Sequence, residues 1–366
     1  MSRPTQAVID LAALRHNYQL ACSLAPSSKT LAVVKANAYG HGSVQAAKTL
    51  EPLAPALAVA CIEEAIELRD AGIKKPILLL EGPFSFGEVQ IASELDFWLM
   101  VENHNHLAFI EESIRQKALS KPIRCWLKLD TGMHRLGFLP HELASVHQRL
   151  VEFDAVQKPV VVSTHFASAD DPKSDFTPQQ IKVFHDATAG LNCESSLCNS
   201  AGIMGWSEAH GNWNRPGFMM YGASPFIEAQ EHAAKLQPVM TLKSKVISVR
   251  SVEKGDTVGY GRTWKAERDS QIATVTVGYG DGYPRHAPSG TPILVNGKRC
   301  TLVGRVSMDM VTVDVTDIGP VNIGADVECW GKHLSINEVA DYIGTIGYEL
   351  MTRMPARVPR VYINAS

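Results

Sequence analysis

Leu31-Ala32-Val33-Val34-Lys35-Ala36-Asn37-Ala38-Tyr39-Gly40-His41-Gly42 is the stretch that decides the fold of this chain. An apolar run ends in a lysine, and small residues, glycines and an aromatic residue follow. Lysine is rarely buried without a partner, so Lys35 is unusual between segments that are typical of a protein interior. An amine that loses solvent at the end of a buried strand favours its neutral form, which is the form that attacks an aldehyde. The stretch therefore predicts a buried strand with a reactive lysine at its carboxyl end.

The bulk composition is that of a globular protein without a nucleic-acid or membrane partner. The chain has 366 residues, of which 45% are hydrophobic, and a net charge of −3. It has no dense Lys/Arg run and no stretch long and apolar enough to span a bilayer. The first ten residues lack the apolar segment of a signal peptide, so we expect a cytoplasmic location. The seven cysteines are scattered and form no C-x-x-C pair, which favours reduced thiols and predicts no metal site.

Short apolar runs alternate with longer segments of helical spacing through the first two-thirds of the chain. A strand that is covered on both faces is apolar throughout, so each run predicts a strand of a parallel sheet. The predicted strands are 31–36, 56–62, 76–81, 97–102, 124–130, 160–165, 195–199 and 214–221. Segment 62–72 has helical spacing and ends in glycine. Thr177 is predicted to cap a helix whose first position is Pro178. Eight such repeats predict a (β/α)8 barrel, the TIM-barrel fold.

The pattern changes near Leu236, where β-branched residues and turns become frequent. Asn296-Gly297 lies between two apolar runs and is a strong hairpin signal. We predict an α/β barrel domain in residues 1–235 and a mostly β C-terminal domain in residues 236–366. The strand predicted at residues 7–10 could pair with either domain.

Polar residues gather where the predicted barrel strands end, which is where (β/α)8 barrels carry their chemistry. They are Lys35, Tyr39, Lys128, Arg135, His165, Asn199 and Ser200, and the eighth segment adds Arg215 together with Gly217 and Phe218. One amine, several cations and hydroxyl groups beside a glycine suit an anionic, phosphorylated aldehyde cofactor. Singly, each residue has a plainer explanation: His165 could be a hydrogen-bonded core histidine, and Arg135 could pair with Asp130. The combination is what predicts a cofactor site.

Residues 32–42 resemble the pyridoxal 5'-phosphate attachment motif of alanine racemases, and the resemblance extends over almost the whole chain. Other matching motifs are 128–137, 164–167, 199–201, 215–222, 258–262, 277–283, 304–309 and 348–350. These motifs are long and specific. The resemblance implies a (β/α)8 barrel followed by a β domain. It also implies a homodimer in which the partner's β domain completes each active site.

The resemblance assigns a role to each candidate residue. Lys35 would hold pyridoxal 5'-phosphate as an internal aldimine and act as one catalytic base, with Tyr260 of the other subunit as the second. The implied cofactor contacts are Tyr39, Ser200, Gly217 and Phe218 at the phosphate, Arg215 at the pyridine nitrogen, and His165 and Asn199 close by. The implied substrate contacts are Arg135 and Met308 at the carboxylate and Tyr279 at the entrance, with Lys128 a candidate for carbamylation.

One position departs from the family pattern. Several relatives have a tyrosine before the arginine of the Arg-Val-Pro-Arg stretch, and its hydroxyl touches the phosphate. Here that position is Ala356, before Arg357. We therefore expect one phosphate contact to be missing or replaced by water.

The implied activity is the interconversion of L-alanine and D-alanine by two-base α-proton transfer on a pyridoxal 5'-phosphate external aldimine. It would supply D-alanine for peptidoglycan or serve alanine catabolism. A serine or broad-specificity amino-acid racemase is one alternative. A pyridoxal-phosphate-dependent decarboxylase of basic amino acids is another, although such enzymes typically set an acidic residue where this chain has Arg215. A vitamin B6 carrier made of the barrel alone is a third, and a β domain with Tyr260 and Met308 argues against it.

Overall fold

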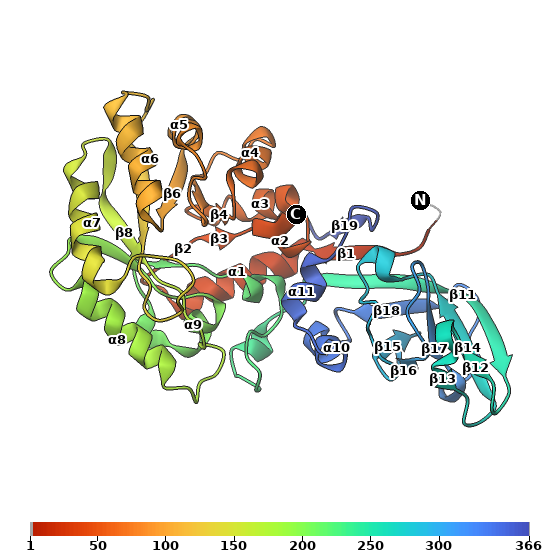
Figure 1. The fold of residues 1–366 in the computed structure, drawn as a ribbon. Coiled ribbons are helices and arrows are strands. Elements are labelled where there is room, and N and C mark those ends of the chain that lie inside the picture. Colours follow the sequence, from red (N-terminus) through yellow and green to blue (C-terminus); the bar gives the residue numbers. More distant parts are fainter. Residues whose placement is uncertain (1–2, 366) are drawn as a thin grey trace.

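The structure is a computed structural model that describes residues 3–365, and it has two parts (Figure 1). A barrel of strands and helices, coloured red to green, fills one end of the molecule. A β-rich part, coloured teal to blue, fills the other end. Helix α11 (Gly347–Thr352) comes late in the chain but packs against α2 (Lys35–Tyr39) of the barrel. Between residues 3 and 365, no helix is long and apolar enough to cross a membrane.

The barrel is a closed ring of parallel strands. Seven of them form a sheet in the order β3-β4-β5-β6-β7-β8-β9, and β10 pairs with β2, which leads into β3. The Leu31 N–H donates to Asn214 O and the Arg215 N–H donates to Cys198 O, so β10 joins both edges of the sheet. This closure confirms the predicted barrel. The bounds are β2 Lys29–Thr30, β3 Ala32–Val33, β4 Leu57–Val59, β5 Ile77–Leu79, β6 Phe97–Val101, β7 Ile123–Lys128, β8 Val156–Ser163, β9 Cys193–Ser196 and β10 Trp213–Asn214.

Helices connect successive strands and cover the outside of the barrel (Figure 1). Their apolar residues recur with helical spacing, as in α4, where Ile62, Ala65 and Leu68 are buried. The remaining helices of the barrel are α1 Leu11–Leu24, α3 Ser43–Leu50, α5 Phe86–Leu95, α6 His104–Arg115, α7 Pro140–Glu152, α8 Phe176–Thr188 and α9 Ser200–Gly205, with α4 at Ile62–Asp70.

Three local predictions are wrong. The first barrel strand ends at Val33, and residues 35–39 form a helical turn instead of continuing it. The predicted strand 214–221 is extended only at β10, because Pro216 lacks an N–H for a ladder, and Phe218–Tyr221 form a 3-10 helix. Helix α8 begins at Phe176, so Thr177 lies inside it and is buried rather than capping it.

The β-rich part is built on one sheet with the strand order β14-β17-β16-β15-β18-β11-β1-β19. Strand β1 pairs with β11 and β19, so the strand predicted at residues 7–10 belongs to this sheet. Asn296 and Gly297 form the predicted hairpin turn, with positive φ at both residues and Val295 opposite Lys298. The bounds are β1 Gln6–Asp10, β11 Met240–Val252, β12 Thr257–Val258, β13 Trp264–Lys265, β14 Ser270–Val275, β15 Pro292–Val295, β16 Lys298–Leu302, β17 Val311–Asp314, β18 Asp326–Trp330, β19 Arg360–Ile363 and α10 Ile336–Ile343. The division of the chain at residue 235 stays a prediction.

The amino end of the barrel is closed by aromatic and charged side chains. Trp98, Trp126 and Trp213 pack on one another, with ring centroids 5.5 to 6.3 Å apart. The Arg124 guanidinium lies over Trp98 at 4.9 Å and pairs with Glu194, which also accepts from the Trp213 indole at 2.8 Å. This packed layer leaves the carboxyl ends of the strands as the open face.

Candidate active site

A cavity of about 830 Å³ opens at the carboxyl ends of the barrel strands, within the size range of small-molecule sites. Every barrel residue that the sequence marks as a site residue lines it. They are Lys35, Tyr39, Lys128, Arg135, His165, Asn199, Ser200, Arg215, Gly217 and Phe218. The structure thus brings these side chains to one place, while their individual roles stay predictions.

Lys35 sits between the end of β3 and a left-handed turn. Ala36, Asn37 and Ala38 have φ values of 51° to 53°, and Tyr39 also has positive φ. This conformation costs an L-residue about 1–2 kcal/mol, so other contacts must stabilise it. The Ala36 N–H donates to Glu64 Oε1 at 2.7 Å, and the Ser43 N–H donates to Asn37 Oδ1 at 2.8 Å. The backbone on the C-terminal side of Lys35 is therefore fixed on both flanks of the turn.

The Tyr39 hydroxyl, Ser200 and Gly217 form one corner of the cavity. A Cβ on Gly217 would lie 2.4 Å from Tyr39 Oη, so only glycine lets the hydroxyl reach this point. Ser200 Oγ accepts from the Gly217 N–H at 3.0 Å and from the Met219 N–H at 3.2 Å. The Gly217 N–H is therefore already bonded within the chain. Burial raises the pKa of Tyr39 to about 12, so its hydroxyl keeps its proton.

Arg215 is buried and held by the ends of two strands. Its Nη1 donates to Ser196 O at 2.8 Å, and its Nη2 donates to Thr164 O at 2.6 Å. Nη1 also donates to Ser196 Oγ at 2.5 Å, and Nη2 donates to Leu197 O at 3.3 Å. The four Nη hydrogens are thus used, and the remaining guanidinium donor is Nε–H. Burial lowers the pKa of Arg215 to about 10, which still leaves it protonated near neutral pH. Burial and then the Arg215 charge lower the pKa of His165 well below its usual range, so His165 is neutral.

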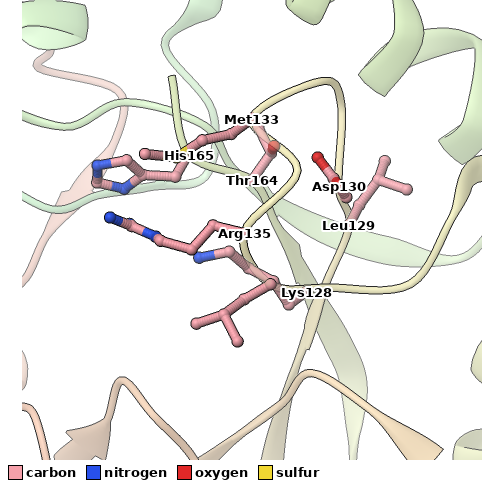
Figure 2. A pocket seen from close by; sticks show the side chains of 8 residues that line it. Lys128, Leu129, Asp130, Met133, Arg135, Thr164 and His165 are labelled. Carbon is pink, nitrogen blue, oxygen red and sulfur yellow. The ribbon is translucent and has the colours of Figure 1, made fainter. Parts of the chain in front are cut away.

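Lys128, Arg135 and His165 line both the cavity and a small neighbouring pocket, in which their side chains point the same way (Figure 2). Burial and then the Arg215 charge lower the pKa of Lys128 to about 8, opposed by Glu102. Asp130 pairs with His134 at 3.2 Å and accepts from two backbone N–H groups. The plainer explanation of Arg135 as the ion-pair partner of Asp130 is therefore wrong, and Arg135 faces the cavity.

The cavity also contains residues that the sequence analysis missed. Glu81 and Glu102 line it, and both lie at the carboxyl ends of barrel strands, as Lys35 and Lys128 do. Glu102 is buried, its Oε1 has no hydrogen-bond partner in the described structure, and burial raises its pKa to about 7. The signal that could have found these residues is their place at strand ends. Tyr348 of α11 lines the cavity too, and its ring stacks on Phe218 at 3.6 Å.

Three predicted site residues lie elsewhere. Tyr260, Tyr279 and Met308 belong to the β-rich part and do not line the Lys35 cavity of their own chain. Their exposed fractions are large for such side chains, at 69%, 41% and 53%. Ala356 does not line the cavity either, whereas Tyr348 does. One chain therefore holds the barrel half of the predicted site and displays the other half on its surface.

Comparison with known proteins gives the same family for both parts of the chain. Residues 9–225 match the family described as "Alanine racemase, N-terminal domain", and residues 239–362 match "Alanine racemase, C-terminal domain". A catabolic alanine racemase of Pseudomonas putida is 52% identical over 361 residues, which cover 99% of each chain. The crystal structure of a biosynthetic alanine racemase from Pseudomonas aeruginosa has a TM-score of 0.94 at 45% identity and covers 99% of this chain and 100% of that one. An alanine racemase from Bartonella henselae with covalently bound pyridoxal phosphate has a TM-score of 0.89 at 29% identity and covers 98% of this chain and 99% of that one.

Proposed function

This chain belongs to the alanine racemase family, and on that premise we propose how its residues interconvert L-alanine and D-alanine. The supporting observation is the single cavity that joins Lys35, Arg135 and Arg215 at the carboxyl ends of the barrel strands. Family membership favours a racemase over the decarboxylase and carrier alternatives.

The cavity fits pyridoxal 5'-phosphate as the cofactor. Lys35 supplies the amine for its aldehyde, and the corner of Tyr39, Ser200, Gly217 and Phe218 supplies hydroxyl groups and a place without a side chain for its phosphate. Arg215 offers Nε–H to the pyridine nitrogen, beside His165 and Asn199. When bound, the cofactor withdraws electrons from the α-carbon of the amino acid and so acidifies its α-hydrogen. The relative from Bartonella henselae is described with this cofactor covalently bound.

Two bases on opposite faces of the α-carbon are the simplest way to exchange its hydrogen between enantiomers. Lys35 takes the proton of D-alanine at Nζ, and Tyr260 takes that of L-alanine at Oη. Each base returns a proton when the reaction runs in the other direction. Because Tyr260 does not line the cavity of its own chain, it must come from a second copy.

The chain therefore acts as a homodimer with two shared sites. Tyr260, Tyr279 and Met308 lie exposed on the β-rich part, as residues that enter another protomer's cavity would. The substrate carboxylate binds Arg135 and the Met308 backbone N–H, and Tyr279 lines the entrance. These contacts hold the α-carbon between the two bases.

Lys128 is the proposed site of carbamylation. Its amine attacks carbon dioxide, a C–N bond forms and one proton leaves to water, which gives a carbamate anion beside Arg135. A pKa of about 8 leaves part of the amine neutral and nucleophilic at neutral pH. The test is the NMR spectrum of the enzyme in labelled bicarbonate: a carbamate carbon signal that Lys128→Ala removes is expected, and a spectrum unchanged by Lys128→Ala would refute the assignment.

The biological role is supply of D-alanine for peptidoglycan or catabolism of alanine, and relatives are named for both. The seven cysteines are all free thiols, which supports a reducing compartment such as the cytoplasm.

The first experiment offers L-alanine to the cofactor-loaded enzyme and follows D-alanine by chiral chromatography, with L-serine as a second substrate. We expect equal amounts of the two alanine enantiomers at the end and slower conversion of serine. Carbon dioxide release from lysine or ornithine, without D-alanine, would replace the proposal by a decarboxylase.

The shared site has its own test. Lys35→Ala and Tyr260→Phe chains, each nearly inactive alone, are combined into hybrid dimers purified through two different tags. A hybrid has one intact site if sites are shared, so activity should return to about half of the wild-type value. No return of activity in stable hybrids would refute the sharing.

A further inference from the structure

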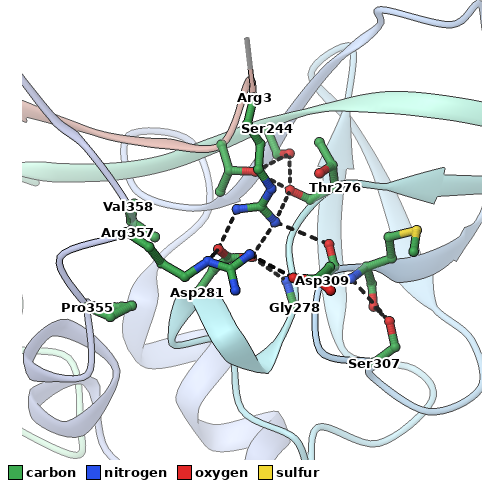
Figure 3. A network of polar contacts seen from close by, with 12 residues as sticks. Arg3, Ser244, Thr276, Gly278, Asp281, Ser307, Asp309, Pro355, Arg357 and Val358 are labelled. Atoms are coloured by element: carbon green, nitrogen blue, oxygen red, sulfur yellow. Dashed lines mark hydrogen bonds and ion pairs between the residues drawn. The ribbon is translucent and has the colours of Figure 1, made fainter. Parts of the chain in front are cut away.

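Asp281 is a buried carboxylate that is held by both ends of the chain (Figure 3). Arg3, which precedes β1, donates from Nη1 to Asp281 Oδ1 at 2.5 Å and from Nη2 to Oδ2 at 2.6 Å. Arg357, which precedes β19, pairs with the same carboxylate through Nε at 3.0 Å. The Gly278 N–H adds a fourth contact at 2.9 Å. Such a forked, charge-assisted arrangement fixes orientation as well as position.

The two arginines also reach a second loop. Arg357 Nη2 donates to Asp309 Oδ1 at 2.7 Å, and Arg3 Nη2 donates to Asp309 O at 3.3 Å. The arginines therefore join two loops, one at residues 278–283 and the other at residues 304–310. Figure 3 shows Asp281 and Asp309 on opposite sides of the two guanidinium groups.

The joined loops carry two of the residues proposed to complete the partner's site. The Tyr279 N–H donates to Ser307 O at 3.0 Å, and the Gly280 N–H donates to Met308 O at 2.8 Å. Tyr279 and Met308 thus sit on one surface formed by two crossing loops. Any rotation of the Asp281 turn moves both residues together.

The third such residue, Tyr260, is connected to the same surface. A Cβ on Gly261 would lie 3.3 Å from the Arg305 guanidinium, and a Cβ on Gly304 would lie 2.9 Å from Val258 O. The segment that bears Tyr260 therefore packs directly on the start of the loop that bears Met308. Tyr260, Tyr279 and Met308 are exposed. Within one chain, their positions are therefore set by the loops and side chains that lie beneath them.

We propose that Asp281, clamped by Arg3 and Arg357, is a positioning residue that sets the substrate-binding surface of Tyr279 and Met308 for the active site of the other protomer. The inference rests on the proposed shared site. Asp281 itself does not touch the substrate. It acts through the two loops, and both ends of the chain are needed to hold it.

The expected effect is on substrate binding more than on turnover. The Met308 N–H and Tyr279 would contact parts of the substrate that do not react, and such contacts are equally strong in the ground state and the transition state. In the cofactor-loaded enzyme, Asp281→Asn should raise the KM for both alanine enantiomers about tenfold and change kcat by less than about twofold. A control in the same part of the molecule is Asp317→Asn, which removes an exposed ion pair with Arg268 and should leave KM unchanged.

A second variant covers the case in which Asp281→Asn does not fold. Arg357→Lys keeps the charge but loses the fork that joins Asp281 to Asp309, and its side chain is partly exposed. It should raise KM in the same direction by a smaller factor. Sedimentation and urea unfolding of each variant show whether the dimer and the fold are intact. A folded, dimeric Asp281→Asn or Arg357→Lys enzyme with wild-type KM overturns the proposal.

Hybrid dimers decide where Asp281 acts. The hybrid contains one Lys35→Ala chain and one Asp281→Asn chain. Only the Asp281→Asn chain keeps Lys35, so only its cavity can be active. That cavity receives the β-rich surface of the Lys35→Ala chain, which still has Asp281. Its KM should therefore be that of the wild type. A KM equal to that of the Asp281→Asn dimer overturns the inference, because Asp281 would then act on its own chain's cavity. The separate hybrid of Lys35→Ala with Tyr260→Phe shows independently whether sites are shared, so the two failures are distinguishable.

Discussion

The Glu64 carboxylate accepts the N–H of Ala36, the residue that follows Lys35, at 2.7 Å. Its other oxygen accepts the Ala60 N–H at 2.8 Å. One side chain thus ties the turn after Lys35 to the loop that follows β4. We infer that this bridge sets the direction in which Lys35 enters the cavity.

Glu64→Gln should lower kcat about tenfold, because its amide can replace only one of the two acceptors and leaves a backbone N–H facing another donor. The measurement is steady-state racemisation in both directions with saturating cofactor. Glu63→Gln, on an exposed neighbour in the same helix, is the control and should behave as wild type. An unaltered kcat in Glu64→Gln would show that the turn holds without the bridge.

Gly217→Ala should weaken cofactor binding about tenfold, since the new methyl would lie 2.4 Å from Tyr39 Oη and displace that hydroxyl from its corner. Titration of the apoenzyme with pyridoxal 5'-phosphate, followed by absorbance, measures the loss. Tyr39→Phe removes the clashing oxygen. When it is added to both proteins, Gly217→Ala should therefore weaken cofactor binding by less than it does in the wild type. If Gly217→Ala binds the cofactor as wild type does, the corner is not its phosphate site.

Arg215→Glu should make the enzyme convert some alanine to pyruvate by transamination. An arginine donates a hydrogen bond to the pyridine nitrogen but does not release its proton, and we infer that this limits the electron demand of the cofactor. An acidic residue would strengthen that demand. Pyruvate is measured with a coupled dehydrogenase, and Arg215→Lys serves as the charge-conserving control. Absence of pyruvate from a folded, cofactor-loaded Arg215→Glu enzyme would refute the idea.

Glu102→Gln should change how stability depends on pH. Burial raises the pKa of Glu102 from 4.5 to about 7, so the folded state holds this proton longer than the unfolded state does. The stability that this proton gives is complete below pH 4.5 and is lost as pH rises through about 7. The glutamine variant has no proton to lose and should exceed the wild type by about 2 kcal/mol at pH 7.5, with little difference at pH 4.5.

Urea unfolding of the holoenzyme at fixed protein concentration tests this prediction. The exposed Glu267→Gln is the matched control and should follow the wild type at every pH. Parallel curves for Glu102→Gln and wild type between pH 4.5 and 7.5 would mean that Glu102 is already ionised in the folded enzyme. Measurements stay below pH 8, where any Lys128 that is not carbamylated titrates in the opposite sense.

The order of the barrel strands could be predicted from the sequence because a doubly covered strand leaves an uninterrupted apolar run. The same logic failed at 214–221, where an apolar run is equally consistent with the buried 3-10 helix that Phe218 begins. The predicted strand ends correctly indicated that Lys35 and Lys128 lie at the cavity. Glu81 and Glu102 occupy equivalent places, but an acidic residue after an apolar run has no chemical signature of its own.

Other parts of the site depend on contacts that no local pattern contains. Tyr348 reaches the cavity only because α11 packs back onto the barrel. Arg3 and Asp281 are 278 positions apart and meet only after the first strand enters the C-terminal sheet. Long-range packing of this kind is a property of the whole fold.

The left-handed turn after Lys35 reverses the usual relation between exposure and mutational tolerance. Ala36 and Asn37 are exposed, and Ala36 also lines the cavity, yet both have φ near 53°, where a β-branched residue is strongly disfavoured. In a scan that places every amino acid at every position, valine, isoleucine and threonine should therefore be rejected at these two exposed positions. The loss of activity should be as severe as when a charged residue is placed in the core. Glycine and asparagine should be the substitutions that survive at Ala36, because this constraint comes from the backbone.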